Sequence, residues 1–355
     1  MVELIYYQQL MDCKLQDFVP FTADAQRVMA NLEQAYVAWV EARRALEQLP
    51  VSMYWQTKGS TDYLTVKYNS ADPGKSLGPR SPQTEALYES HQHDKAMYKD
   101  RAHKADALVS ERAGLYRRLR LPALPDQQAE ILRSLDTEDL LGTDLMVVGT
   151  NAFVAYQLAC NARFPAGDEE TEDFDLTWCR GSKASLSSAG KEGAGKTLLG
   201  VLRKIDASYR INPRKPYQAR NDNGYEVELL AAPSTHPLPK GEAFEPMVSL
   251  IEQEWLLQGR PLSVVVATLR GRACPLYVPD PRWMALHKLW LARKPERNAA
   301  KRPKDQRQGE VLLDATRHFL PSSHPLDVGF VMDLPEELRP HFDNWCQSRQ
   351  FVPQP

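Results

Sequence analysis

The sequence has no long hydrophobic run, no excess of one charge and no export signal. No segment approaches the roughly 18 consecutive apolar residues that a membrane-spanning helix requires. Residues 1–7 lack the basic region and apolar stretch of a secretory signal. The 44 basic and 46 acidic residues nearly cancel, which excludes a histone-like polycation. We therefore expect a cytoplasmic protein without a membrane partner.

Cysteine is also scarce. The five cysteines are scattered along the chain without the paired spacing of a zinc ribbon or a disulfide framework. In a chain without an export signal, such a set is typical of reduced thiols. At 355 residues the chain is longer than a typical single domain, so we expect two or three structural units.

The N-terminal third is rich in helical patterns. Apolar residues at helical spacing predict a helix over 22–48, after a Thr22 cap. Aromatic and β-branched residues predict a hairpin from strands at 51–56 and 63–68. Glycine and proline predict a loop over 72–82, and a long polar helix should then follow over 83–120.

The most informative pattern is an acid-apolar-acid segment that follows a glycine turn. A strand over 173–176 would direct Asp173 and Asp175 to one face and the residues between and after them into the core. Two carboxylates on one face repel each other, so the pair is stable mainly when a cation lies between them. Oxygen ligands of this kind suit Mg²⁺, with Mn²⁺ as the alternative.

A third acid comes from a later alternating segment, 225–230. There Glu226 and Glu228 alternate with apolar residues, which indicates another half-buried strand with carboxylates on one side. We favour Glu228 as the third metal ligand and catalytic acid, with Glu226 as the alternative.

Before both of these segments, an apolar strand at 145–148 ends in Gly149 and Thr150. Gly149 would let the backbone approach a phosphate. Thr150 and the helix start at Asn151 would bind phosphate oxygens through hydroxyl and amide donors. The competing interpretation is an ordinary glycine turn with threonine as a helix cap.

Further patterns complete the organisation of the chain. Apolar alternation predicts strands, and helical spacing predicts helices, at several further places. The strands lie at 262–269 and 274–278, and the helices at 127–135, 197–205, 284–292 and 308–319. We predict an N-terminal helical and hairpin module over 1–135, a core over 136–280 and a C-terminal helical region over 281–355.

At these residues the chain resembles nucleotidyltransferases of the DNA polymerase β superfamily. That superfamily has a strand ending in Gly-Ser or Gly-Gly, a helix, an Asp-apolar-Asp strand and a further acid. The motifs of the chain are more similar still to those of a bacterial branch of nucleotidyltransferase-fold proteins. That branch carries a GT-x-A-x-x-A-Y motif followed by a T-x-D-x-D motif. The resemblance extends over about residues 50–315 and includes Val278-Pro279-Asp280-Pro281, Leu286-His287-Lys288-Leu289 and Lys304-Asp305.

The resemblance implies an α/β (α+β) fold with a small mixed sheet. It implies metal-dependent transfer of a nucleoside monophosphate from an NTP such as ATP to an acceptor hydroxyl, which would belong to RNA, including tRNA, or to protein. Lys288, Lys304 and Asp305 would then bind the nucleotide, although Lys288 also fits a solvent-facing helix position. Some relatives act in toxin-antitoxin or defence systems. A catalytically silent nucleotide-binding or regulatory module is the alternative.

One motif points elsewhere. Residues 190–197 match the pattern of a phosphate-binding P-loop in full. A P-loop must follow a buried strand, however, and residues 181–189 are small and polar. We therefore interpret the segment as a loop that caps the next helix, with Lys196 as a further nucleotide-binding candidate. A P-loop NTPase is the less favoured alternative.

A basic run ends the long helix of the N-terminal third. Arg117, Arg118 and Arg120, with Arg112, are interleaved with an aromatic residue in a way that suits an RNA backbone. Basic residues at a helix C-terminus also complement the helix dipole on a solvated face. We favour this second interpretation.

Overall fold

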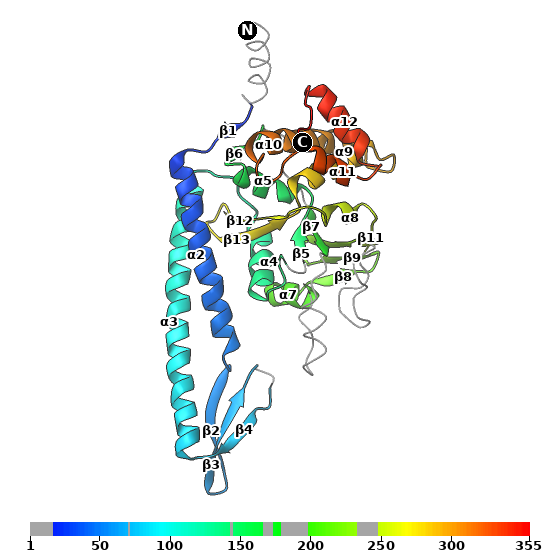
Figure 1. Cartoon of the computed structure of the whole chain (residues 1–355). Coiled ribbons are helices and arrows are strands. Elements are labelled where there is room, and N and C mark those ends of the chain that lie inside the picture. The colour runs from blue at the N-terminus through cyan, green and yellow to red at the C-terminus, as the bar shows by residue number, and fades with distance from the viewer. Residues whose placement is uncertain (1–16, 70–71, 143–144, 166–172, 179–197, 233–247) are drawn as a thin grey trace.

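The computed structural model describes residues 17–69, 72–142, 145–165, 173–178, 198–232 and 248–355 (Figure 1). Two long antiparallel helices, α2 (Ala23–Gln48) and α3 (Pro82–Arg118), form an arm that projects from the body. Thr22 caps α2 by accepting a hydrogen bond from the backbone N–H of Ala25 at 3.2 Å. Ser81 and Thr84 form a capping box at the start of α3. Both predicted helices are confirmed.

A small antiparallel sheet forms the tip of the arm. It consists of β2 (Ser52–Lys58), β3 (Thr61–Lys67) and β4 (Lys75–Pro79). The predicted hairpin is confirmed, but the loop predicted over 72–82 is wrong in part, because β4 lies within it. Pairing with β3 orders this segment, and an edge strand tolerates its glycine and proline.

The body is built around a mixed sheet with strand order β5-β7-β10-β9-β8, and β11 also pairs with β10. The central pair, β7 and β10, is parallel, whereas β5, β9 and β8 run antiparallel to their neighbours. The strands are β5 (Leu145–Val147), β7 (Asp173–Trp178), β8 (Arg210–Asn212), β9 (Lys215–Arg220), β10 (Glu226–Ala231) and β11 (Val248–Ser249). The small mixed sheet and the strands predicted at the acidic segments are confirmed.

Two further pairs of strands lie outside this sheet. β12 (Leu262–Ala267) and β13 (Ala273–Val278) pair antiparallel with each other, and β1 (Val19–Pro20) pairs with β6 (Ala162–Arg163). The apolar strands predicted near 262–278 are therefore confirmed, but they form a sheet of their own.

Helices surround the sheets. In the middle of the chain, the single turn Thr150–Ala152 leads into α5 (Phe153–Ala159), and α4 (Asp126–Thr137) and α7 (Leu198–Ile205) pack together. The C-terminal part contains α8 (Gln253–Leu256), α9 (Pro281–Arg293), α10 (Arg302–Phe319), α11 (Val328–Asp333) and α12 (Arg339–Ser348). The predicted helices at 127–135, 284–292 and 308–319 are confirmed, as is the described part of the one at 197–205.

One aspartate and one glycine determine where α9 begins and how closely it packs against α10. Asp280 caps α9 by accepting from the backbone N–H of Arg282 at 2.9 Å. A Cβ atom on Gly309 would lie 2.6 Å from Cγ of Leu289, so α9 and α10 approach each other closely at this point.

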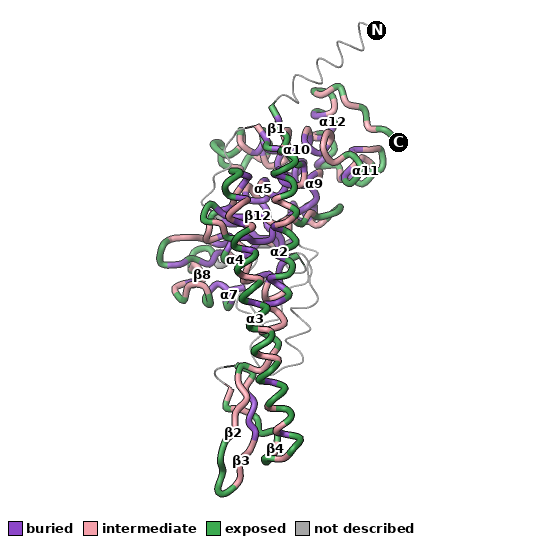
Figure 2. Tube along the Cα trace, turned by 90° about the vertical axis from the view of Figure 1, so that its left-hand side faces the viewer, coloured by how far each residue is buried: buried purple, intermediate pink, exposed green. Residues whose placement is uncertain are grey.

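Polar contacts join the arm to the body. The hydroxyl of Tyr36 in α2 donates to Asp136 in α4 at 2.9 Å. The guanidinium of Arg133 lies 4.0 Å from the centre of the Trp39 ring. Figure 2 shows that buried residues gather in the body, while the far part of the arm is mostly intermediate or exposed. Among the described residues, no helix has the length and apolar character needed to cross a membrane.

Candidate active site

Asp175 and Glu228 lie side by side on the two central strands of the mixed sheet. In the parallel pairing of β7 with β10, Asp175 is the register partner of Glu228. The flanking residues Phe174, Leu176 and Val227 are fully buried, so the acids occupy the opposite face of the two strands. Adjacent strands are about 4.8 Å apart, which brings the two carboxylates together.

Gly149 closes one side of this acidic pair. It follows β5, and its φ of +72° lies in the left-handed region that favours glycine. A Cβ atom at this position would lie 2.5 Å from Oδ2 of Asp175. The backbone N–H of Val148 also donates to the carbonyl oxygen of Asp175 at 3.1 Å. The turn therefore reaches the Asp175 carboxylate only because residue 149 has no side chain.

Gln218, from the neighbouring strand β9, orients the glutamates. Its buried side-chain amide donates to Glu228 and, at 3.1 Å, to Oε2 of Glu226. The amide of Asn212 in turn donates to the Gln218 oxygen at 3.0 Å. This chain of hydrogen bonds holds Glu228 in place on the Asp175 side of the sheet.

These groups line a cavity of about 800 Å³ between the mixed sheet and the α9–α10 region, here called the first cavity. Most of the residues predicted from the sequence to act on a nucleotide contribute to its wall. They are Gly149, Thr150, Asp175, Glu228, Lys288, Lys304 and Asp305. Glu226 is not among its lining residues, which favours Glu228 as the third acid.

Lys288 lies in a buried ion pair. Its ammonium donates to Asp305 at 2.9 Å, and the other carboxylate oxygen of Asp305 accepts from Arg297 at 2.7 Å. Burial lowers the pKa of Lys288 although Asp305 and, more weakly, Asp175 act to raise it. Burial acts to raise the pKa of Asp305, but Lys288 and Arg297 outweigh it and the pKa is lowered. The solvent-facing alternative for Lys288 is therefore wrong.

Cations gather on the wall of the first cavity that faces the carboxylates. Arg297 follows α9, Lys301 precedes α10, and Lys304 lies in its first turn. Lys215 contributes from β9, and Lys294 is paired with the buried Glu252 at 2.9 Å. The first cavity thus has Asp175 and Glu228 on the sheet side, while its helix side carries most of the cations together with Glu252, Glu296 and Asp305. Carboxylates opposite cations match a metal-bound polyphosphate.

His287 is an unusual part of the wall. It is 6% exposed, and neither ring nitrogen has a hydrogen-bond partner among the described residues. Its ring packs beside Trp255 and Trp290, with centroid distances of 6.4 and 6.5 Å, and the two tryptophan rings also contact each other. Burial, and the positive charge of Lys288, lower the pKa of His287 to about 3, so the ring is neutral at pH 7.

Three predicted site residues are not among the described lining of the first cavity. Asn151 is buried and lines a different cavity. The backbone of Asp173 pairs with Glu226, but its side chain lies outside the described part of the structure, as do Lys196 and the whole segment 190–197. Among the side chains that are described, no three His, Cys, Asp or Glu residues form a metal-binding group. The three-acid metal site stays a prediction.

The structure adds residues that the sequence did not single out. Gln218 and Arg297 come to the site through strand register and a buried ion pair. The alternation of Gln218 with apolar neighbours is the one signal that marked it as lying on the polar face of a strand. His287 was visible beside Lys288, but its lack of partners is a property of the packing alone.

Comparisons with known proteins identify the family of the chain. A family model described as nucleotidyltransferase matches residues 126–327, which include the strands, the turn and the α9–α10 region. No curated protein sequence matches the chain. One similar solved structure is an antigenic nucleotidyltransferase-like protein from Paracoccidioides brasiliensis. It is 15% identical, the match covers 63% of this chain and 88% of that one, and the TM-score is 0.34. A similarity of this size does not establish a shared fold.

Proposed function

This chain belongs to a nucleotidyltransferase family, and from that premise we propose that it transfers a nucleoside monophosphate from an NTP to an acceptor hydroxyl. In this reaction the acceptor oxygen forms a bond to the α-phosphorus. The bond between that phosphorus and the oxygen bridging to the β-phosphate breaks. The hydroxyl proton is lost, and pyrophosphate leaves.

The observation that carries the proposal is the pairing of Asp175 with Glu228 beside Gly149. Two carboxylates at matched register positions provide the oxygen ligands that Mg²⁺ uses together with substrate phosphates. Asp173, two residues earlier on the same strand, is the further ligand that we propose. A divalent cation bound there would neutralise the charge on the phosphate oxygens during the displacement.

The basic wall of the first cavity gives the triphosphate a second set of contacts. We assign Arg297, Lys301 and Lys304 to the β- and γ-phosphates, because phosphoryl transfer depends on positioning and charge neutralisation more than on covalent help. Lys288 is paired with Asp305 and so joins α9 to α10, whose first turn carries Lys304. The proposal includes a core of the polymerase β type, since the order of turn, acid strand and later acid strand matches that pattern.

The test is label transfer from each α-labelled NTP in Mg²⁺ or Mn²⁺, with total RNA or lysate protein as acceptor. Asp175→Asn and Glu228→Gln should each lower label transfer at least about 100-fold, since each removes one negative ligand from the proposed metal site. Chelation of the divalent cation should abolish transfer in the unchanged protein.

Glu226→Gln is the matched control. Glu226 also contacts Gln218, but it does not line the first cavity, so this change should leave most of the activity. Loss of activity in Glu226→Gln with retention in Glu228→Gln would reassign the third acid. If the unchanged protein binds Mg²⁺ and NTP but never releases pyrophosphate, the chain is the silent binding module instead. NTP hydrolysis that is lost only on changing Lys196 would favour the P-loop alternative.

A further inference from the structure

A second cavity, of about 1020 Å³, adjoins the first one and shares Thr150 as a lining residue. It lies where the end of α3 and the chain after it meet α5 and the end of β12. Resting on the proposed function, we propose that this second cavity binds the acceptor, and that the acceptor is a single-stranded nucleic acid.

The charge of the second cavity is the first argument. Its lining contains Arg117, Arg120 and Arg163 and no acidic residue, whereas the first cavity has both signs. None of these three arginines forms an ion pair with a carboxylate in the described part of the chain. Unpaired guanidinium groups around a cavity suit phosphodiester oxygens, which they bind through paired N–H donors.

The backbone positions these arginines. Arg120 has a φ of +52°, a left-handed conformation that ends α3 and turns the chain. Its N–H donates to the carbonyl of Arg117 at 2.9 Å, and its own carbonyl accepts a hydrogen bond from the Arg163 guanidinium. This contact brings β6 and the end of α3 together, so cations from two distant segments face one space. Arg118, between them in sequence, does not line the cavity.

The remaining wall suits the sugar and base of a strand. Phe153, Leu121 and Leu124 are buried apolar residues of the lining, and Leu269 is a large apolar residue that is 74% exposed at its edge. Alternation of apolar surface with cationic groups is what proteins use to bind single strands with little base preference. A peptide without acidic side chains would leave these three arginines without an anionic partner, so a polyanion fits better.

The location connects the second cavity to the chemistry. Thr150 follows Gly149, which approaches the Asp175 carboxylate. A strand seated in the second cavity with its end at Thr150 would therefore present its terminal hydroxyl at the boundary of the first cavity. Arg117, Arg118 and Arg120 are all exposed, as the solvated-face interpretation of the basic run predicts. The proposal adds a nucleic-acid contact for Arg117 and Arg120, which line the second cavity.

The experiment measures binding of fluorescent 20-nucleotide single-stranded RNA and DNA by anisotropy, without NTP and over a range of salt concentrations. Arg117→Ala/Arg120→Ala/Arg163→Ala should raise Kd at least tenfold. It should also reduce the slope of log K against log salt by about 2, since each phosphate contact on a single strand contributes roughly 0.7. The rise in Tm that ATP with Mg²⁺ produces should remain.

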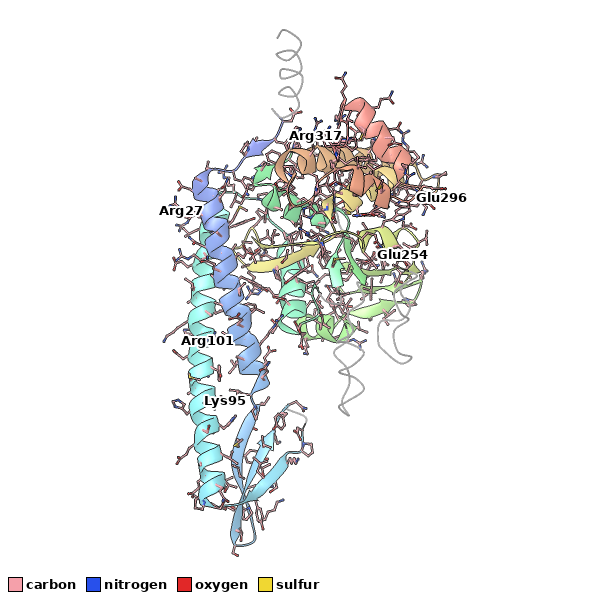
Figure 3. The ribbon with its side chains drawn as sticks, in the orientation of Figure 1. Arg27, Lys95, Arg101, Glu254, Glu296 and Arg317 are labelled. Carbon is pink, nitrogen blue, oxygen red and sulfur yellow. The ribbon has the colours of Figure 1, made fainter. Side chains whose placement is uncertain are left out.

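The matched control removes the same number of charges from the arm. Lys99, Arg101 and Lys104 are exposed residues of α3 outside both cavities, and Figure 3 shows Arg101 on the arm, away from the body. Their triple alanine variant should bind the oligonucleotide like the unchanged protein. Because Arg163 also holds the Arg120 carbonyl, Arg117→Ala/Arg120→Ala serves as a second variant if the triple change prevents folding.

Several outcomes would overturn the inference: no oligonucleotide binding by the unchanged protein, equal binding by the arginine variants, or equal weakening by the arm control. Label transfer to lysate protein without any transfer to RNA would also overturn the inference. The proposed function is tested separately, because Asp175→Asn should abolish label transfer and keep oligonucleotide binding. If no variant or substrate gives transfer but the arginine effect is present, the nucleic-acid site stands and the catalytic proposal falls.

Discussion

Gly149 combines two constraints in one residue: a positive φ and contact with a carboxylate. Gly149→Ala should lower label transfer at least about 100-fold, because the new Cβ would displace the Asp175 carboxylate that the reaction needs. It should also lower the free energy of unfolding by roughly 1–3 kcal/mol through backbone strain. Kinetics with a labelled NTP and urea unfolding measure the two effects separately.

Gly59 provides the control for this substitution. Its φ of +65° is similar, but a Cβ atom there would have no neighbour within 4 Å. Gly59→Ala should therefore carry a strain penalty of about 1 kcal/mol and leave activity unchanged. Full activity in Gly149→Ala would mean that the turn does not set the position of Asp175 in the working enzyme.

His287 makes the stability of the fold dependent on pH. The pKa of its ring is lowered to about 3 from the ordinary 6.5, so the unfolded chain binds a proton in this interval and the folded chain does not. The free energy of unfolding must then fall as pH drops below 6.5, by about 2 kcal/mol at pH 5 from this residue. His287→Phe should remove that component, because phenylalanine does not titrate.

The measurement for His287 is urea unfolding of both proteins at pH 7 and pH 5. The difference in stability between the two pH values should be smaller in His287→Phe than in the unchanged chain. An identical pH dependence in both proteins would show that the ring finds a proton acceptor or solvent in the folded state. Weaker NTP binding by a folded His287→Phe would add His287 to the nucleotide contacts of the first cavity.

Single residues were predictable to the extent that their role followed from local alternation. The period-two pattern was sufficient to assign Asp175 and Glu228 each to the polar face of its own strand. The choice between Glu226 and Glu228 required the cavity, since both alternate in the same way. Arg297 was not predictable, because its contact with Asp305 depends on how the chain turns between α9 and α10.

Between helices, the buried pair of Lys288 and Asp305 joins α9 to α10. The two side chains are 5% and 2% exposed, so removing one partner leaves a buried charge without compensation. Asp305→Asn should lower the free energy of unfolding by roughly 3–5 kcal/mol. Urea unfolding at pH 7 measures this change.

A double substitution separates the structural role of this pair from a nucleotide contact. Lys288→Met/Asp305→Leu removes both charges and should recover much of the lost stability, because apolar residues of similar volume replace a buried ion pair well. If the double variant is no more stable than Asp305→Asn, the ion pair of Asp305 with Arg297 contributes more to stability than its ion pair with Lys288. NTP affinity in the refolded double variant then reports whether Lys288 itself contacts phosphate.

Whole elements were predicted well where the pattern was local. The sequence pattern, with a Thr22 cap for α2, placed α2, α3 and α9 within three residues at each end, but the helix predicted at 308–319 begins later than α10 does. The strand β4 was missed, because its glycine and proline indicate a loop and only pairing with β3 orders it. The separate pairing of β12 with β13 was also beyond the sequence, since alternation predicts a strand but does not identify its partner.

In the whole molecule, the arm and the body are held together near the arm's base. Tyr36 of α2 contacts Asp136 of α4, and Trp39 of α2 contacts Arg133 of α4. Tyr36 and Trp39 also belong to the same apolar core as the strands of the body. Farther out, α3 continues beyond the end of α2 and carries the tip sheet, which lies at the end of the arm opposite the body (Figure 1). The contacts that hold the arm to the body therefore do not include the tip sheet.

This arrangement predicts that the tip can be removed without loss of nucleotide chemistry. The ammonium of Lys95 donates to the carbonyl of Val51, so these residues are neighbours and a short Gly-Ser linker can replace residues 52–94. The shortened protein should keep a Tm within a few degrees of the full chain, because the contacts at the base of the arm remain.

The shortened protein should also keep its affinity for ATP with Mg²⁺, since no residue of the excised segment lines the first cavity. Transfer to the acceptor should persist as well, because the second cavity is built from residues beyond the excision. Retained ATP binding with lost transfer would assign acceptor recognition to the tip sheet, and lost ATP binding would mean that the arm shapes the first cavity through the body.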